Sequence, residues 1–339
     1  MAIRPPLVID GHCHLASSRC IPRGFFLGVA TNIARKMSAQ GMPADIEKVA
    51  RMLILQYDDH FADKLVEKMD DAGIDRTILL APDFTYVFES EFTMEDLARQ
   101  HAQVRDRHPG RFHIFFGVDP RWGQAGYDFF ERVVSEHGFE GLKVYPPCGF
   151  SPSDELLFPL YEICSERGLP VLLHTGPTTP TLRFDTAHPS LIDVAAKKFP
   201  NVNFILAHGG VNFVEEAKLM CSYRPNVYLD ISAFPAVMAA GGWQAHLADL
   251  FAQKINHKII FGSDWPVFSM KDDLKAMISG LLEEDGPMSK LSHADVARIM
   301  AGNVQSLLPT ISGPNSQEDS AKEMREPNPG GHRPWTAVE

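Results

Sequence analysis

Eight short apolar segments, most of them followed by a segment with helical periodicity, constrain the fold of this chain more than any other feature. Most are continuously apolar, which is typical of parallel strands that are covered on both faces. Eight strands alternating with helices predict an α/β fold, a (β/α)8 or TIM barrel. A doubly wound open sheet is the alternative, but no GxGxxG pattern marks the first strand–helix turn. The expected strands are 7–12, 77–82, 113–120, 141–147, 169–176, 201–210, 226–232 and 258–266.

The segments between these strands have the residue spacing of helices. In residues 60–73, Phe61, Leu65 and Met69 recur at every fourth position, and Gly73 is of the type that most often ends a helix. Thr93 is suited to cap the next helix at its amino end. Helices are therefore also expected at 92–110, 126–138, 154–168, 189–200, 214–223, 243–255, 271–284 and 293–308.

Two segments fall outside this alternation. Residues 16–59 form a long insertion after the first strand, with an expected helix around 44–56. The insertion lies on the side where loops shape the active site of a barrel, which predicts a lid, with a bulky surface excursion as the alternative. Residues 312–339 are rich in Pro, Gly, Ser and Glu and predict a disordered tail, which leaves residues 1–311 as one domain.

Composition narrows the class of protein. Apolar residues make up 45% of the 339 residues, enough for a sizeable core. The net charge of −11 and the lack of a basic patch argue against a nucleic-acid partner. No segment reaches transmembrane length, and the first residues lack the apolar stretch of a signal peptide. The five scattered cysteines do not predict a disulfide framework, so we expect a cytoplasmic protein.

Side chains that can bind metals occur where the expected strands end. His12 and His14 follow the first strand, His174 the fifth, His208 the sixth and Asp264 the eighth. Because the carboxyl ends of barrel strands surround the active site, these residues are expected to converge. Imidazoles with one carboxylate suit a divalent ion such as zinc, with manganese or iron as alternatives. The competing interpretation is that they are hydrogen-bonded polar groups at the barrel mouth.

The sequence His12-Cys13-His14 offers three adjacent metal-binding side chains. In an extended strand, alternate side chains share a face, so His12 and His14 are expected to point together into the barrel mouth. Cys13 then points toward the surrounding helices, where a thiol behaves as a small buried apolar group.

These motifs resemble the amidohydrolase superfamily, in the amidohydrolase-2 branch of metal-dependent hydrolases related to aminocarboxymuconate-semialdehyde decarboxylase. The resemblance covers about residues 7–308, and it is carried by IDGHCHL, GLKVYP, VLLHTG, FILAHGG, FGSDWP and MAGNVQSLL. It implies that His12, His14, His174 and Asp264 bind one divalent ion, with a water completing the shell. It also implies that His208 orients or deprotonates this water, and that Asp264 both binds the ion and carries the proton.

Four further residues are predicted to bind substrate. Lys143 resembles a strand-four lysine that some superfamily members carbamylate to bridge two metal ions, but few carboxylates are available for a second ion. A cation that binds a substrate carboxylate or carbonyl is therefore favoured. Tyr145 shares the face of Lys143, with core packing as the alternative. Arg121 and Arg183 are placed on loops and could hold a carboxylate by two hydrogen bonds, unless they are solvated.

The predicted function is a metal-dependent hydrolase, in which a metal-activated water attacks a carboxylic ester, lactone or amide of a small carboxylate-bearing substrate. The alternative is a decarboxylase, a carboxy-lyase acting without oxidation on an aromatic or unsaturated acid. Many aromatic-acid decarboxylases of this branch have Glu-x-His in the first strand, whereas this chain has His-x-His, as aminocarboxymuconate decarboxylase also does. A non-catalytic metal-binding barrel is disfavoured by the complete ligand set. The resemblance also implies a homodimer.

Overall fold

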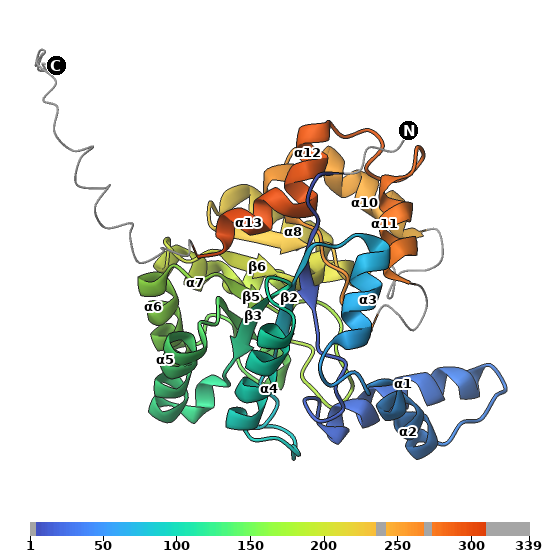
Figure 1. The fold of residues 1–339 in the computed structure, drawn as a ribbon, viewed down its shortest axis with the longest axis vertical. Helices are drawn as coiled ribbons and strands as arrows, with labels where there is room; N and C mark the ends of the chain where they lie inside the picture. The colour runs from blue at the N-terminus through green and yellow to red at the C-terminus, as the bar shows by residue number, and fades with distance from the viewer. Residues whose placement is uncertain (1–4, 235–241, 268–272, 310–339) are drawn as a thin grey trace, which may run out of the picture. The chain divides into compact units, whose positions relative to one another are not determined.

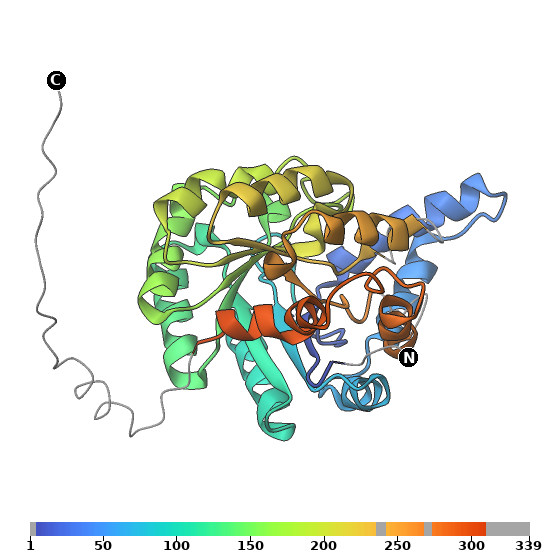
Figure 2. The same ribbon diagram turned by 90° about the horizontal axis from the view of Figure 1, so that it is seen from above.

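The structure, a computed structural model, describes residues 5–234, 242–267 and 273–309 of the 339-residue chain. Its strands form one parallel sheet in chain order, surrounded by helices (Figures 1 and 2). The predicted (β/α)8 barrel is therefore confirmed. The strands are β1 (Ile9–Cys13), β2 (Arg76–Ala81), β3 (Phe112–Gly117), β4 (Gly141–Val144), β5 (Val171–Leu173), β6 (Phe204–Leu206), β7 (Val227–Asp230) and β8 (Ile259–Ile260).

Backbone hydrogen bonds between β1 and the segment after β8 close the barrel. The His14 amide donates to the Trp265 carbonyl at 2.7 Å, and the Asp264 amide donates to the His12 carbonyl at 2.8 Å. Cys13 and Trp265 form a parallel bridge between the same segments. This closure brings the first and the last motif of the chain side by side at the barrel mouth.

Several strands end earlier than expected, and the chain turns sharply at the mouth after two of them. After β6, the backbone φ angles of His208, Gly209 and Gly210 are 59°, 49° and 68°. Asp264, after β8, has a φ of 58°. These left-handed conformations cannot continue a strand, so the side chains of His208 and Asp264 leave the plane of the sheet at the mouth.

Helices cover the outside of the barrel, and their ends follow the expected signals. Thr93 caps α4 and forms a capping box with Asp96, while α3 ends at Gly73 in the left-handed conformation. A π-helical turn joins α12 to α13 within the expected helix 293–308. The outer helices are α3 (Asp63–Ala72), α4 (Met94–Arg107), α5 (Gln124–His137), α6 (Phe158–Arg167), α7 (Asp193–Lys198), α8 (Val214–Tyr223), α10 (Gly242–Ala252), α11 (Leu274–Leu282), α12 (His293–Ala297) and α13 (Asn303–Leu307).

Alternating side chains of the strands pack into two separate apolar layers. In β5, Leu172 belongs to the cluster that fills the barrel, whereas Val171 and Leu173 belong to the cluster between strands and helices. Burying one such leucine contributes about 1.5–3 kcal/mol relative to leaving it exposed. Cys13 is fully buried in the outer layer, as the alternation predicts.

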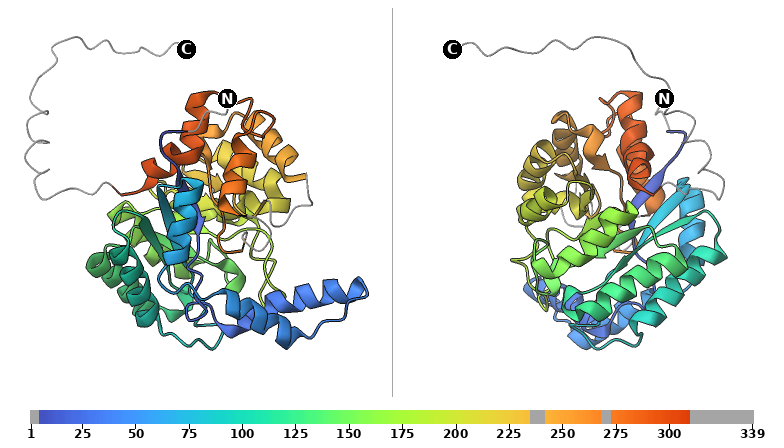
Figure 3. Two further views of the ribbon diagram at one scale, coloured as in Figure 1. Left: turned by 45° about the vertical axis from the view of Figure 1, so that its right-hand side comes forward. Right: turned by 90° about the vertical axis from the view of Figure 1, so that its left-hand side faces the viewer.

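The insertion at residues 16–59 forms a pair of helices, α1 (Arg23–Ala39) and α2 (Ile46–Gln56), that projects from the barrel (Figure 3). We call this pair the α1–α2 hairpin. The helix expected around 44–56 is confirmed as α2, but α1 was not predicted. Pro22 stands at its N-cap position, where no side chain caps the helix. The hairpin has a small apolar cluster of its own: Ala16, Phe26, Ala30, Ala50, Leu53 and Tyr57.

The tail predicted to be disordered, residues 312–339, lies outside the described residues. Within the described ranges, no helix combines the length and the apolar character that crossing a bilayer requires.

Candidate functional site

Five of the predicted site residues come together at the barrel mouth. One potential ligand atom each from His12, His208 and Asp264 lies within 4.8 Å of the others. His14 joins this group through Asp264, since its Nε2 lies 3.6 Å from Asp264 Oδ1. His174 joins through His208, with 3.3 Å between His174 Nδ1 and His208 Nε2. The structure therefore brings the four predicted ligands and His208 together, but the most closely grouped ligand atoms include His208 and not His14 or His174.

Hydrogen bonds on one ring nitrogen fix the tautomers of the β1 histidines. His12 Nδ1 donates to Asp230 Oδ2 at 2.8 Å, and His14 Nδ1 donates to the Leu80 carbonyl at 3.0 Å. A carboxylate and a carbonyl only accept hydrogen bonds, so each Nδ1 carries the proton and each Nε2 keeps its lone pair. Metal-binding histidines typically have this arrangement.

The other two histidines present lone pairs to each other. The Ser232 hydroxyl donates to Asp230 and so accepts from His208 Nδ1, which lies 2.7 Å away. His174 Nε2 donates to the Pro177 carbonyl at 3.1 Å. The unprotonated His208 Nε2 and His174 Nδ1 therefore face each other at 3.3 Å. This contact is unfavourable between two acceptors, and a cation bound at His174 Nδ1 would relieve it.

The donor set fits a divalent metal ion. His12 Nε2 is buried without a hydrogen-bond partner among the described residues, although Asp264 Oδ1 lies 3.5 Å away. Imidazole nitrogens with one carboxylate suit zinc, manganese or iron better than calcium or magnesium. His12, His14, His174 and Asp264 would hold such an ion, with His208 adjoining it.

Burial keeps the imidazoles in the protonation state that binds metals. It lowers the pKa of His14 and of His174 to about 3, and Lys143 contributes in the same direction. The pKa values of His12 and His208 also lie well below the ordinary value, again because of burial. Neutral imidazole is the form that coordinates a metal, so the site needs no deprotonation of its histidines at neutral pH.

Lys143 is a buried amine near the histidines, and it does not line the cavity. Its Nζ has no hydrogen-bond partner among the described residues. Burial lowers the pKa of Lys143 to about 8, although Asp230 and Asp264 act in the opposite direction. A part of the amine is therefore uncharged at neutral pH. This state is compatible with a substrate contact and with carbamylation. Either role stays a prediction.

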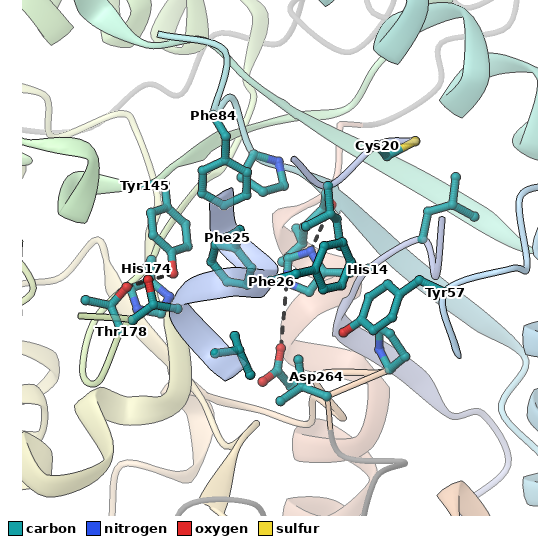
Figure 4. Close-up of a pocket in the computed structure, with 18 of the residues that line it drawn as sticks. His14, Cys20, Phe25, Phe26, Tyr57, Phe84, Tyr145, His174, Thr178 and Asp264 are labelled. Atoms are coloured by element: carbon teal, nitrogen blue, oxygen red, sulfur yellow. Dashed lines mark hydrogen bonds and ion pairs between the residues drawn. The ribbon is translucent and has the colours of Figure 1, made fainter. Parts of the chain in front are cut away.

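A cavity of about 440 Å³ opens onto the site (Figure 4). His14, His174, His208 and Asp264 line its inner end. Tyr145 also lines it and stacks on His174, with 4.3 Å between the ring centroids and 23° between the ring planes. The structure thus places Tyr145 in the wall of the cavity, while its contact with a substrate stays a prediction.

The structure does not bring the two predicted arginines to the site, since neither lines the cavity. Arg121 donates to Asp119 at 2.8 Å and 2.6 Å, and its guanidinium lies 4.2 Å from the ring centroid of Tyr86. Arg183 is exposed and paired with Asp185. Each guanidinium is already paired with an aspartate two positions away, so neither is positioned to hold a carboxylate in the cavity.

Sequence reasoning missed the residues that support the histidines. Asp230 is fully buried at the end of β7, and it accepts hydrogen bonds from His12, from the His208 amide and from Ser232. Its position in NVYLDIS, an acid at the end of an apolar strand, is the same signal that identified Asp264.

Tyr57, from the insertion, lines the cavity and was missed as well, because a loop gives no sequence signal for which side chains face a cavity.

Comparisons with known proteins agree with this architecture. A family model described as amidohydrolase (Amidohydro_2) matches residues 9–309. No curated protein matches the chain.

Solved structures share the fold at low sequence identity. A TIM-barrel protein from Bordetella bronchiseptica is 20% identical, with a TM-score of 0.61 over 88% of this chain and 97% of its own. A dihydroxybenzoic acid decarboxylase from Polaromonas sp. JS666, solved with manganese and 2-nitroresorcinol, is 18% identical, with a TM-score of 0.57. The match covers 90% of this chain and 97% of the decarboxylase. A 4-oxalomesaconate hydratase from Rhodopseudomonas palustris is 18% identical, with a TM-score of 0.56, and the match covers 89% of this chain and 95% of the hydratase. The match to the family model, which spans most of the chain, shows that this protein belongs to the amidohydrolase (Amidohydro_2) family of metal-dependent enzymes.

Proposed function

We propose that this protein is a metal-dependent hydrolase that cleaves a carboxylic ester, a lactone or an amide. The observation that carries the proposal is the buried group of His12, His208 and Asp264, whose potential ligand atoms lie within 4.8 Å of one another next to a cavity. When bound, a divalent ion polarises a carbonyl group and lowers the pKa of water to about 7. The chain must then supply a proton acceptor and a rigid setting for it.

Asp264 is placed to accept and return a proton. Its carboxylate lies between His12 and His14 and also lines the cavity. Burial raises the pKa of Asp264 well above the ordinary value, so a proton on this carboxylate is not strongly disfavoured. It can take a proton from the attacking water and pass it to the leaving oxygen or nitrogen.

His208 is held rigidly beside this carboxylate. Its Nδ1 donates to the Ser232 hydroxyl, which is itself held by a hydrogen bond to Asp230, so the ring cannot rotate without breaking its bond to a fixed acceptor. Its Nε2 keeps a lone pair and can accept a hydrogen bond from the attacking water, which orients that water toward the carbonyl carbon.

Decarboxylation is the second candidate, and the apolar character of the cavity favours it. A carboxylate transferred into such surroundings loses hydration, which assists loss of the uncharged carbon dioxide. The bond between the carboxylate carbon and the ring or enamine carbon would break, and its electron pair would take up a proton at that carbon. Asp264, whose pKa is raised by burial, would supply this proton. A dihydroxybenzoic acid decarboxylase with the same fold also motivates this candidate.

One experiment separates the two reactions. The protein is stripped of metal, reloaded with zinc, manganese or iron, and incubated with aryl lactones, esters, amides and dihydroxybenzoates. Acid release from a lactone, ester or amide is expected, whereas carbon dioxide release would overturn hydrolysis in favour of decarboxylation. Asp264→Ala should abolish turnover, and the exposed Asp58→Ala serves as control. Zinc as the resident ion, the cytoplasmic location and the homodimer stay predictions.

A further inference from the structure

The α1–α2 hairpin forms an apolar side of the cavity. Phe25, Phe26, Val29 and Ile33 of α1 line the cavity together with Leu53 of α2. The α1 residues recur at intervals of three and four positions, so they lie on one face of the helix. The insertion therefore contributes a largely apolar surface to the space in front of the metal site.

A series of aromatic contacts runs from this surface to the site histidines (Figure 4). Phe25 lies 5.1 Å from Phe84, and Phe84 lies 5.0 Å from Tyr145, measured between ring centroids. Tyr145 then stacks on His174 at 4.3 Å. A ligand whose polar end reaches the histidines would therefore extend its body along aromatic rings, which favour flat apolar groups.

The cavity offers no cation to a second anionic group. Among the described residues that line it, none is a lysine or an arginine, and Asp264 is the one carboxylate. The arginines predicted for this role, Arg121 and Arg183, are paired with aspartates elsewhere. Burying a carboxylate without a partner is strongly unfavourable, so a ligand with a charge at both ends is disfavoured here.

Two polar side chains interrupt the apolar side, Asn32 of α1, which is exposed, and Tyr57. Tyr57 follows α2, lines the cavity and is 8% exposed, and its ring packs against Phe26 at 4.9 Å. Figure 4 shows its oxygen turned toward the side of the cavity where Asp264 lies. Burial raises the pKa of Tyr57, so the hydroxyl stays protonated. It is thus available to donate a hydrogen bond to an uncharged oxygen of a ligand.

We propose that the α1–α2 hairpin determines substrate specificity. The ligand it selects has an extended, flat apolar body, a single polar end at the histidines and one uncharged acceptor that Tyr57 binds, and it carries no second anion. This inference rests on the proposed function, because it takes the metal site as the place where the polar end reacts.

Binding to the metal-loaded full chain tests the ligand class by calorimetry. Biphenyl-4-carboxylate is compared with biphenyl-4,4′-dicarboxylate, which differs from it by the second charge. We expect the monocarboxylate to bind at least about tenfold more tightly, equivalent to 1.4 kcal/mol. Equal affinities, or no binding of the monocarboxylate, would overturn the proposal.

A second pair of probes tests Tyr57. 4-Phenoxybenzoate has an ether oxygen where 4-benzylbenzoate has a methylene group. Tyr57→Phe should weaken binding of the ether about three- to tenfold and leave the methylene analogue unchanged, as expected for one neutral hydrogen bond. Tyr223→Phe, at an exposed position of α8, is the matched control. Equal effects of Tyr57→Phe on both probes would contradict the assigned hydrogen bond.

The hairpin surface is tested with two leucines of α2. Leu53 lines the cavity, whereas Leu55 is 76% exposed. Leu53→Ala should weaken all monocarboxylate probes about threefold or more, whereas Leu55→Ala should not. Equal effects of the two substitutions would contradict the proposal. Thermal unfolding of each variant verifies that the fold is retained.

These measurements fail separately from the proposed function. Selective binding that depends on Leu53 and Tyr57, without hydrolysis of any ester, lactone or amide, supports the inference and overturns the hydrolase. Rapid hydrolysis of small aliphatic lactones at rates that neither substitution alters, without selective binding, supports the hydrolase and overturns the inference.

Discussion

His12 Nδ1 donates a 2.8 Å hydrogen bond to Asp230 Oδ2, and this bond joins the first strand of the barrel to the seventh. Both side chains are fully buried. The same carboxylate accepts from the His208 amide and from Ser232. One acid thus orients two of the histidines at the mouth, without itself facing the cavity.

Asp230→Asn should weaken metal binding about 10- to 100-fold, the usual effect of losing a supporting carboxylate. The amide cannot accept from His12 and Ser232 on equal terms, so the His12 tautomer is no longer fixed. Competition with a chromophoric chelator measures the affinity. Asp249→Asn, on the exposed side of α10, is the control, and equal affinities of the two variants would contradict this role of Asp230.

Removing the metal should lower the unfolding temperature. Without a cation, the facing lone pairs of His174 and His208 and the buried Asp264 carboxylate are uncompensated. An ion present at about 100 times its dissociation constant stabilises the fold by about 2.7 kcal/mol, which shifts the midpoint by several degrees. Scanning calorimetry with and without chelator measures this shift. In Asp264→Ala, most of this metal-dependent shift should disappear. A shift of unchanged size would indicate that the ion binds elsewhere in the protein.

Lys143→Met should leave the metal content at one ion per chain. The buried Nζ has no hydrogen-bond partner among the described residues, so an apolar side chain of similar length is expected to retain or raise stability. Binding of carboxylate ligands should fall, because the cation near the histidines is lost. Elemental analysis of both proteins gives the stoichiometry. Two ions in the wild type and one in the variant would instead support a carbamylated, bridging Lys143.

His101 should make stability depend on pH. Its Nδ1 donates to the Leu97 carbonyl at 2.8 Å, and burial lowers the pKa of His101 to about 4, against about 6.5 in the unfolded chain. Between these values the unfolded state binds more protons, so the free energy of unfolding falls as pH drops from 6.5 to 4, by up to about 3 kcal/mol.

Urea unfolding of metal-free protein at pH 7 and pH 5 measures this dependence. His101→Gln should reduce the difference between the two pH values, whereas the exposed His246→Gln should not. An unchanged difference in His101→Gln would assign the pH dependence to other groups.

The barrel could be predicted from the sequence because each buried strand is an apolar run with a helix after it. The end of each strand was less predictable. β6 ends at Leu206, just before the left-handed turn at His208, and only a glycine-rich neighbourhood at 209–210 hints at that turn. β8 ends at Ile260, four residues before the left-handed Asp264. The helix α1 was missed because Pro22 offers no capping side chain.

The candidate site, like the fold, could be predicted from the sequence only in part. Ligands at strand ends could be located, because barrel topology brings those ends together. The loop arginines could not be placed from residue type alone. Yet Asp119 and Asp185 each stand two positions from an arginine, and this spacing was available as a sign of local pairing.

The small apolar cluster within the α1–α2 hairpin has an evolutionary consequence. Because Phe26, Ala30, Ala50 and Leu53 pack with one another, the hairpin carries part of its own core. Substitutions on its cavity face can therefore accumulate with little effect on the strands that hold the metal ligands. The barrel could keep its chemistry while the hairpin diversifies as an exchangeable module, and grafting it onto a related barrel is a direct route to new selectivity.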